Sequence, residues 1–328
     1  MQNYFRGGLI KDQMDFPIHK IAVPTPFQVG DVNAYLWDEE PLTLIDSGPP
    51  TKKAKSSLVS SLSLLGYDIR DVERVVLTHL HPDHSGLASF IKEESGASIA
   101  VHEDDIALFK NLKSRPILDM CVLIGLDKSV ADLVAQYYSE MPAPNFSVDV
   151  DIRLHDGDHL RSSSGTDFEV IHCPCHSPGS ISLYNPHFKC LISGDTLLKE
   201  ITPNALFSWE IRDNPGLKLY KSTLNRLLGY DVDLVLPGHG GGLKGKEIKD
   251  RIREILKYHE ERGRKILGTI KGNGKMTIYQ ISIELFGSLP ISEVPLSIFE
   301  VTGHLKILKE RGLVESREES GILFYSAL

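Results

Sequence analysis

The stretch Thr78-His79-Leu80-His81-Pro82-Asp83-His84-Ser85-Gly86 decides the fold of this chain. It holds three histidines and an aspartate within six residues, and it overlaps the end of the apolar strand expected over 74–78. Imidazole nitrogen and carboxylate oxygen are ligands that suit Zn²⁺, Fe and Mn. The stretch therefore predicts a metal site in a loop at a strand end, in preference to a polar surface loop that happens to hold histidines.

Three further polar residues follow apolar runs in the same way. His176 lies in Pro174-Cys175-His176-Ser177-Pro178-Gly179, Asp195 in Ile192-Ser193-Gly194-Asp195-Thr196, and His239 in Val235-Leu236-Pro237-Gly238-His239-Gly240. Loops at one edge of a sheet can bring together ligand groups from distant parts of a chain. The glycines beside these residues permit the tight turns that such a meeting requires.

Short apolar strands alternate with amphipathic segments up to about residue 243. The expected strands are 18–23, 32–37, 42–45, 74–78, 98–101, 168–172, 181–184, 190–193 and 234–236. A helix is expected over 53–65, before Gly66, and a helical insertion over 104–138. We expect this insertion and the loop 201–214, which contains Phe207 and Trp209, to shape a substrate pocket.

The motifs resemble those of the metallo-β-lactamase superfamily, whose pattern is His-x-His-x-Asp-His followed by a distant His, Asp and His. The resemblance implies an αββα sandwich over about Phe16–Leu243. It also implies that His79, His81 and His176 hold one metal, that Asp83, His84 and His239 hold a second, and that Asp195 bridges them. Asp46 matches an early aspartate that usually supports the metal loop by hydrogen bonds.

The chemistry implied by this resemblance is hydrolysis with two divalent metal ions, Zn first and Fe or Mn as alternatives. Two metals sharing a hydroxide would supply the nucleophile, and Asp83 is the catalytic residue expected to orient it. Cys175 resembles the glyoxalase II version of the motif. Cys173 and Cys175 stay an alternative as soft ligands, although the His and Asp set is complete without them. The remaining histidines, His259 and His304 among them, are expected to be surface or packing residues.

The C-terminal part after the glycine-rich run 238–245 has a different pattern. Helices are expected over 247–271, 277–285 and 296–311, followed by strands over 313–317 and 322–327 with a turn at 318–321. This order predicts a winged helix, and the segment around His259-Glu260-Glu261-Arg262-Gly263 resembles the winged-helix appendage of lactamase-like proteins. The predicted division is a hydrolase domain over 1–243 and a winged-helix domain over 244–328.

Composition limits the functions open to the chain. It has 328 residues, four cysteines and a net charge of −8, so neither a disulfide framework nor a general polyanion binder is expected. The segment 244–328 has 15 Lys and Arg against 12 Asp and Glu, a net of +3 that leaves −11 for the rest. No apolar run approaches the roughly 18 residues of a membrane span, and no signal peptide is evident. We expect a cytoplasmic protein without membrane contact.

The preferred function is hydrolysis of a small ester or thioester. The acidic N-terminal part argues against a long polyanionic substrate, because phosphate binding needs Lys and Arg along a groove. An endoribonuclease acting on single-stranded RNA is the alternative suggested by the winged-helix resemblance, and a non-enzymatic winged-helix regulator is a third class. Binding of nucleic acid by the tail is not favoured, and the sequence leaves open whether the chain forms a homodimer.

Overall fold

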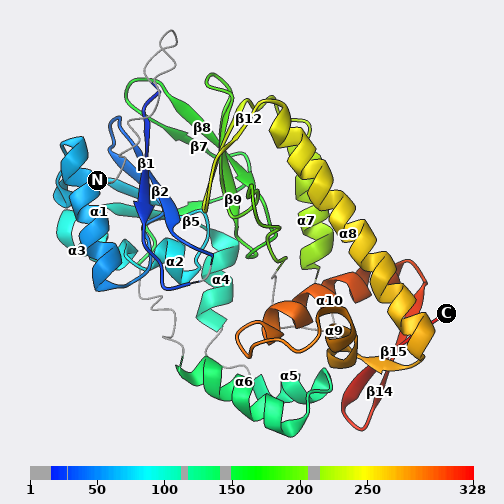
Figure 1. Ribbon diagram of the computed structural model, residues 1–328. Helices are drawn as coiled ribbons and strands as arrows, with labels where there is room; N and C mark the ends of the chain where they lie inside the picture. Colours follow the sequence, from blue (N-terminus) through cyan, green and yellow to red (C-terminus); the bar gives the residue numbers. More distant parts are fainter. Residues whose placement is uncertain (1–15, 28, 112–116, 141–148, 206–214) are drawn as a thin grey trace, which may run out of the picture.

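The computed structural model describes residues 16–27, 29–111, 117–140, 149–205 and 215–328. Within them the chain forms two six-stranded sheets and a smaller three-stranded one (Figure 1). The first sheet runs in the order β1 (Ile18–Val23), β2 (Val32–Trp37), β3 (Thr43–Ile45), β4 (Arg74–Val76), β5 (Ser98–His102), β6 (Ile152–Leu154). The second runs β12 (Leu243–Lys244), β11 (Leu234–Pro237), β10 (Cys190–Gly194), β9 (Ile181–Asn185), β8 (Asp167–His172), β7 (His159–Arg161).

The two large sheets pack face to face, and strand β2 shows how one strand serves two cores. Every residue of β2 is buried, and its side chains alternate between the two faces of the sheet. Tyr35 and Trp37 join the core between the sheets, where the Trp37 ring lies 4.9 Å from the ring of Phe168. Ala34 and Leu36 join the core beneath the outer helices. A strand buried on both faces is therefore apolar except at Asn33, whose amide donates to the carbonyl of Pro237 at 2.8 Å.

Helices cover the outer face of each large sheet. The first sheet carries α1 (Lys52–Leu65) and α3 (Ala88–Ser95), with the short η1 (Ile69–Asp71) and α2 (Pro82–Ser85) beside them. The second carries α7 (Gly216–Leu227) and the first half of α8 (Lys246–Asn273). The αββα arrangement expected from the sequence is confirmed, and the expected strands are found to within two residues at each end.

Helix α1 illustrates why the local sequence adopts its structure. The hydroxyl of Thr51 accepts a hydrogen bond from the backbone N–H of Ala54 and so caps the first turn. Ala54, Leu58 and Leu62 recur at four-residue spacing and are fully buried against the first sheet. Gly66 ends the helix with a φ of 93°, a left-handed conformation that favours glycine.

The insertion is helical, as predicted, and forms α4 (Glu103–Asn111), α5 (Ile117–Leu123) and α6 (Lys128–Glu140). The buried side chains of Ile124, Leu126 and Val134 share one core with the C-terminal segment. The backbone N–H of Tyr279 donates to the carbonyl of Ile124 at 3.0 Å. The described part of α5 and α6 therefore packs on the C-terminal segment.

The C-terminal segment contains the three helices and the hairpin that were expected. They are α8, α9 (Ile278–Phe286), α10 (Val294–Glu310), β14 (Val314–Glu319) and β15 (Ile322–Ala327), and the short β13 (Met276–Thr277) pairs with β15. The predicted turn over 318–321 was too long, because Glu318 and Glu319 still pair within β14. Ser320 and Gly321 both have positive φ, so a two-residue turn closes the hairpin.

No helix in the described part of the chain is both long enough and apolar enough to span a membrane.

The burial of α8 against the second sheet predicts the effect of shortening one side chain. Ile252 is 1% exposed and lies in the core with α7, so Ile252→Ala should lower the free energy of unfolding by about 2–5 kcal/mol. Urea denaturation followed by circular dichroism measures this change. The control is Leu64→Ala, since Leu64 is 76% exposed and its truncation should leave the midpoint nearly unchanged. Equal midpoints for the two variants would contradict this packing.

Candidate metal centre

The histidine-rich stretch forms a loop and one helical turn directly after β4. His79 and His81 lie in the loop, Pro82 is the first residue of α2, and Asp83 and His84 lie within α2. Proline is suited to this first helical position because its ring fixes φ and it has no N–H to leave unpaired. The turn compacts the stretch, so that its ligand-type side chains can converge on one small volume.

The seven side chains predicted from the sequence are brought together by the fold. His79 Nε2 lies 3.0 Å from His81 Nδ1, and His84 Nε2 lies 3.2 Å from His239 Nε2. Three sets of these residues each offer possible ligand atoms that lie within 4.8 Å of one another. The sets are His79, His81 and His176; His79, His84 and Asp195; and Asp83, His84 and His239. These groups are adjacent, since they share His79 and His84.

Asp195 lies between these groups. Its Oδ2 is 3.6 Å from His176 Nε2 and 3.7 Å from His239 Nε2, while its Oδ1 is 3.5 Å from His84 Nε2. Asp195 Oδ1 is buried and has no hydrogen-bond partner within the described part of the chain. A buried carboxylate oxygen without a partner is unfavourable, and a cation placed among these side chains would satisfy it. The residues present therefore fit a metal.

The electrostatic environment differs between the histidines of the cluster. Burial, with His84 and His81 nearby, holds the pKa of His79 well below its usual value, and burial lowers the pKa of His81 to about 3. Although burial opposes it, the neighbouring histidines hold the pKa of Asp195 well below its usual range. His79 and His81 are thus neutral imidazoles beside an ionised carboxylate near neutral pH, as cation ligands require. Burial opposes protonation of His84 and His239, but Asp195 and Asp46 hold the pKa of His84 well above its usual value, and Asp83 and Asp195 raise that of His239. A cation bound at these two rings would take the place of a proton.

The second ring nitrogen of several histidines is fixed by a neighbouring acceptor. His84 Nδ1 lies 2.8 Å from Asp46 Oδ2, His176 Nδ1 3.0 Å from the carbonyl of Asn204, and His239 Nδ1 3.0 Å from the carbonyl of Asp31. A ring that donates through Nδ1 presents the lone pair of Nε2. In all three histidines Nε2 is the nitrogen that faces the cluster.

Asp46 also organises the backbone of the loop. Besides its contact with His84, it accepts hydrogen bonds from the backbone N–H and the hydroxyl of Thr78, each at 2.8 Å. Asp46 has a φ of 58°, a conformation that non-glycine residues rarely adopt. The supporting role implied by the family resemblance is consistent with this geometry.

Gly238 occupies a place where no side chain would fit. A Cβ atom there would collide with Asp195 Oδ1 and would lie 2.8 Å from His84 Cε1. The glycine before His239 is therefore required for the close approach of the β11 loop to the cluster.

Sequence reasoning missed Asp105, which joins two of the loops. This fully buried carboxylate of α4 accepts hydrogen bonds from the backbone N–H of Leu80 at 2.8 Å, from Gly179 N–H at 2.6 Å and from the Ser177 hydroxyl at 2.9 Å. Leu80 lies between His79 and His81, and Ser177 follows His176. Burial raises the pKa of Asp105 to about 6. Its position at the start of the expected insertion concealed this role, because only the folded chain brings the two loops to it.

Other candidate ligands in the described part of the chain are two buried thiols and a second histidine pair, His102 and His172, which with Asp104 offers ligand atoms within 4.8 Å of one another. Cys173 and Cys175 are buried thiols, and burial raises the pKa of both, that of Cys173 to about 11. His102 and His172 stack with ring centroids 3.9 Å apart and planes at 14°. One cation cannot lie in the planes of two rings stacked in this way. Neither pair is therefore a better candidate than the histidine and aspartate cluster.

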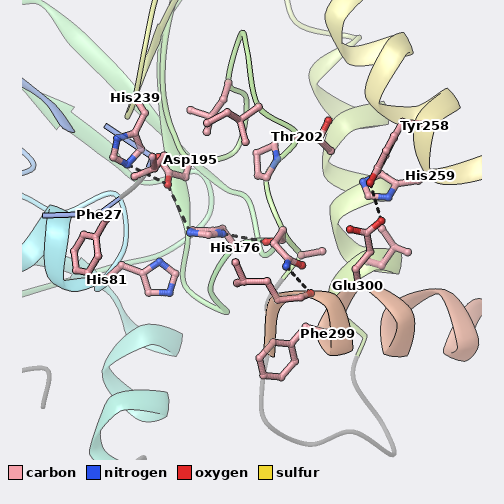
Figure 2. Close-up of a pocket in the computed structure, with 18 of the residues that line it drawn as sticks. Phe27, His81, His176, Asp195, Thr202, His239, Tyr258, His259, Phe299 and Glu300 are labelled. Atoms are coloured by element: carbon pink, nitrogen blue, oxygen red, sulfur yellow. Dashed lines mark hydrogen bonds and ion pairs between the residues drawn. The ribbon is translucent and has the colours of Figure 1, made fainter. Parts of the chain in front are cut away.

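A pocket of ≈ 490 Å³ opens from the cluster. Figure 2 shows His81, His176, Asp195 and His239 at one end of the labelled residues and Tyr258, His259 and Glu300, from α8 and α10, at the other. The lining includes residues 201–205, as expected for the start of that loop, whereas Phe207 and Trp209 lie outside the described residues. The described lining contains residues of α8 and α10 and none of α4–α6.

An αββα fold with clusters of histidine and aspartate at its strand ends defines a metal-dependent hydrolase. Residues 28–239 match the family model of the metallo-beta-lactamase superfamily, and the chain belongs to this superfamily. It is similar to the probable metallo-hydrolase YqjP of Bacillus subtilis (strain 168), with 26% identity over 94% of this chain and 97% of that protein.

Two further similarities concern the activity and the fold. The hydroxyacylglutathione hydrolase GloC of Haemophilus influenzae is 26% identical over 62% of this chain and 83% of that protein. The crystal structure of a beta-lactamase domain protein from Burkholderia ambifaria superposes with a TM-score of 0.82 at 25% identity, over 95% of this chain and 92% of that chain. This last similarity extends through the C-terminal segment.

The hydrogen bonds of Asp46 and Asp105 predict that both carboxylates support metal binding without touching the metal. Asp46→Ala and Asp105→Ala should each leave a folded protein whose metal affinity is weaker by about 10- to 100-fold. Competition with a chromophoric chelator measures the affinity, and circular dichroism checks the fold. Asp132→Ala on α6 is the control, because that side chain is 56% exposed and lies outside the cluster. An unchanged affinity in either variant would remove that carboxylate from the support of the centre.

Proposed function

We propose that the chain is a dinuclear metal hydrolase that acts on a small ester or thioester. One observation carries this proposal: three groups of possible ligand atoms, each within 4.8 Å, stand side by side at one end of a pocket. In this proposal His79, His81 and His176 hold the first metal, Asp83, His84 and His239 hold the second, and Asp195 bridges them. Two divalent cations, Zn first and Fe or Mn as alternatives, would polarise the substrate carbonyl and lower the pKa of water.

Asp83 is proposed as the residue that orients the attacking water. Its Oδ2 lies 3.4 Å from His239 Nε2, and the side chain lines the pocket. Burial opposes ionisation, but His84 and the hydrogen bond to His239 lower the pKa of Asp83 to about 2. An ionised carboxylate at this position can accept a hydrogen bond from water and hold its lone pair toward a carbonyl carbon.

The form of the pocket supports a small substrate. A volume of ≈ 490 Å³ is within the range of pockets for small molecules, and much of the lining is apolar, including Leu198, Leu217 and Phe299. The similarity to a hydroxyacylglutathione hydrolase favours ester or thioester chemistry, because an acylglutathione is a thioester. A long polyanion would need a basic groove, and the described lining contains no Lys or Arg.

The division into domains over 1–243 and 244–328 is also a proposal, as is the winged-helix form of the second. Helices α8–α10 followed by the β14–β15 hairpin support this form. The hairpin tip carries the exposed residues Glu318 and Glu319, which would face phosphate with the wrong sign. We therefore propose an architectural role for the segment and keep the endoribonuclease as the alternative.

The dinuclear proposal predicts two metals per chain. Elemental analysis of protein reconstituted with Zn²⁺, Mn²⁺ or Fe²⁺ and freed of excess metal should find this ratio. His81→Ala should lose metal and activity together, because its ring is part of a ligand group. His155→Ala is a suitable control, since this exposed histidine lies outside the groups. One metal or none after reconstitution with each ion would contradict the dinuclear centre.

The substrate proposal predicts the outcome of a panel run on the metal-loaded protein. A glutathione thioester, an acyl-CoA, a lactone, a simple aryl ester, a phosphodiester and single-stranded RNA are supplied in parallel. Turnover of an ester or thioester is expected, abolished by a chelator and restored by metal. Cleavage of RNA with no ester or thioester turnover would replace the proposal with the endoribonuclease.

A further inference from the structure

The C-terminal segment forms the end of the pocket that lies farther from the histidine and aspartate cluster. Tyr258 and His259 come from the middle of α8, and Phe299, Glu300 and His304 come from α10 (Figure 2). The family model ends at residue 239, so these side chains lie beyond the part of the chain that it matches. A molecule bound at the cluster and extending along the pocket would therefore meet a wall that the superfamily region does not supply.

Close packing brings α10 to this wall. A Cβ atom at Gly303 would lie 2.9 Å from the Cβ of Leu217 on α7, a distance that real side chains avoid. The glycine thus permits α10 to cross α7 with backbone in near contact. His304 follows Gly303 directly, so the helix crossing also fixes the position of its imidazole in the pocket wall.

His259 and His304 form a buried pair with one unused nitrogen. They are 5% and 3% exposed, and His259 Nδ1 lies 3.5 Å from His304 Nε2. His259 Nε2 is buried and has no hydrogen-bond partner in the described part of the chain. Buried polar atoms are nearly always paired with protein, water or ligand. His259 lines the pocket, and a molecule bound there that reaches this nitrogen would supply the missing partner.

The pair is uncharged near neutral pH. Burial, with Lys221 and Arg262 nearby, lowers the pKa of His259 to about 4, and burial with the neighbouring His259 holds the pKa of His304 well below its usual value. Neutral imidazoles can exchange donor and acceptor roles between their two nitrogens. The unused nitrogen can therefore bind a hydroxyl, an amide or a carbonyl.

The charges around the pair disfavour an anion. Glu300 lines the same end, and its Oε1 accepts from Arg262 Nε at 2.9 Å and from the Tyr258 hydroxyl at 2.7 Å. The two cations beside the pair are thus both engaged by carboxylates, Arg262 by Glu300 and Lys221 by Glu260, and the described lining itself has no Lys or Arg. A carboxylate or phosphate placed here would lose hydration without gaining a cation.

We propose that this end of the pocket is a recognition subsite for an uncharged, polar-tipped acyl chain, with His259 as its hydrogen-bonding residue. The apolar side chains of Leu217, Leu296 and Phe299 contact the chain's methylene groups, and the neutral imidazole binds its terminal hydroxyl, amide or carbonyl. The assignment rests on the proposed ester or thioester hydrolysis and names its substrate class. It makes the C-terminal segment the part of the protein that selects the substrate.

The experiment compares three acyl chains that differ only at the tip. Phenyl esters of hexanoate, 6-hydroxyhexanoate and 5-carboxypentanoate report turnover, and the corresponding anilides, which resist hydrolysis, report binding by calorimetry to the metal-loaded protein. The hydroxyl-tipped probe should exceed the plain hexanoate probe by about 3- to 10-fold, both in kcat/KM and in affinity, since one hydrogen bond to an uncharged group has this effect. The carboxylate-tipped probe should be the weakest of the three, because its charge would be buried without a cation.

Variants of the pair test whether His259 is responsible. His259→Phe should abolish the preference for the hydroxyl tip over the plain chain, His259→Gln should retain part of it, and Glu300→Gln should weaken the rejection of the carboxylate. His155→Phe is the matched control, because His155 is exposed and outside the described lining. Thermal unfolding and metal content identify any variant that has lost its fold or centre, in which case His259→Gln and Glu300→Gln decide.

The outcomes separate this inference from the proposed function. If the anilides bind with the expected preference but no ester is hydrolysed, ester hydrolysis is wrong and the recognition site stands. If esters are hydrolysed but His259→Phe keeps the wild-type preference, or the carboxylate tip binds best, the inference is overturned and the hydrolase stands.

Discussion

A cluster of imidazoles and carboxylates held out of water at the junction of two sheets is the constraint on which the rest of this structure depends. His84 is fully buried and Asp195 is 8% exposed, and burying a charged carboxylate is unfavourable unless donors or cations surround it. The chain meets this requirement with imidazole rings whose far nitrogens are fixed by backbone carbonyls or by Asp46. His84, His176 and His239 are therefore each positioned by a hydrogen bond made outside the cluster, which would lower the cost of organising them when a cation binds.

The cluster lies at the seam between the sheets, and hydrogen bonds to main-chain carbonyls fix that seam. The backbone N–H of Asn33 donates to the carbonyl of Gly238 at 2.7 Å, and the hydroxyl of Tyr35 donates to the carbonyl of Pro237 at 2.7 Å. On the other side of the cluster, Ile181 N–H donates to the carbonyl of Thr78 at 2.8 Å. These bonds join residues of one sheet to the residues that precede ligand-type side chains of the other. Sliding of one sheet over the other would break both the seam and the cluster.

Local patterns were sufficient for the strands, for α1 and for the ligand-type residues, because each of these is marked by a short stretch of sequence. The strands β6, β7, β12 and β13 were not foreseen, since they have two or three residues and no clear alternation. Asp105 could not be identified either, because its three donors come from loops up to 74 residues away. The role of His259 was obscured for a different reason: it occupies one position in an apolar helical stripe, where a packing residue is the ordinary interpretation.

That stripe explains how a single helix places the far wall of the pocket. Along α8 the buried residues are Ile248, Ile252, Ile255, His259, Ile266 and Ile270, at spacings of three, four and seven that keep them on one face. The isoleucines before His259 pack on α7 and the second sheet, whereas those after it join the core shared with α5 and α6. His259 interrupts the stripe where the helix passes from one core to the other, and there the pocket lies beneath it. Because α8 is continuous, the position of His259 along the helix is fixed relative to the isoleucines on either side of it. The distance from the histidine and aspartate cluster to this imidazole is therefore set by helical geometry and by the packing of α8 in its two cores.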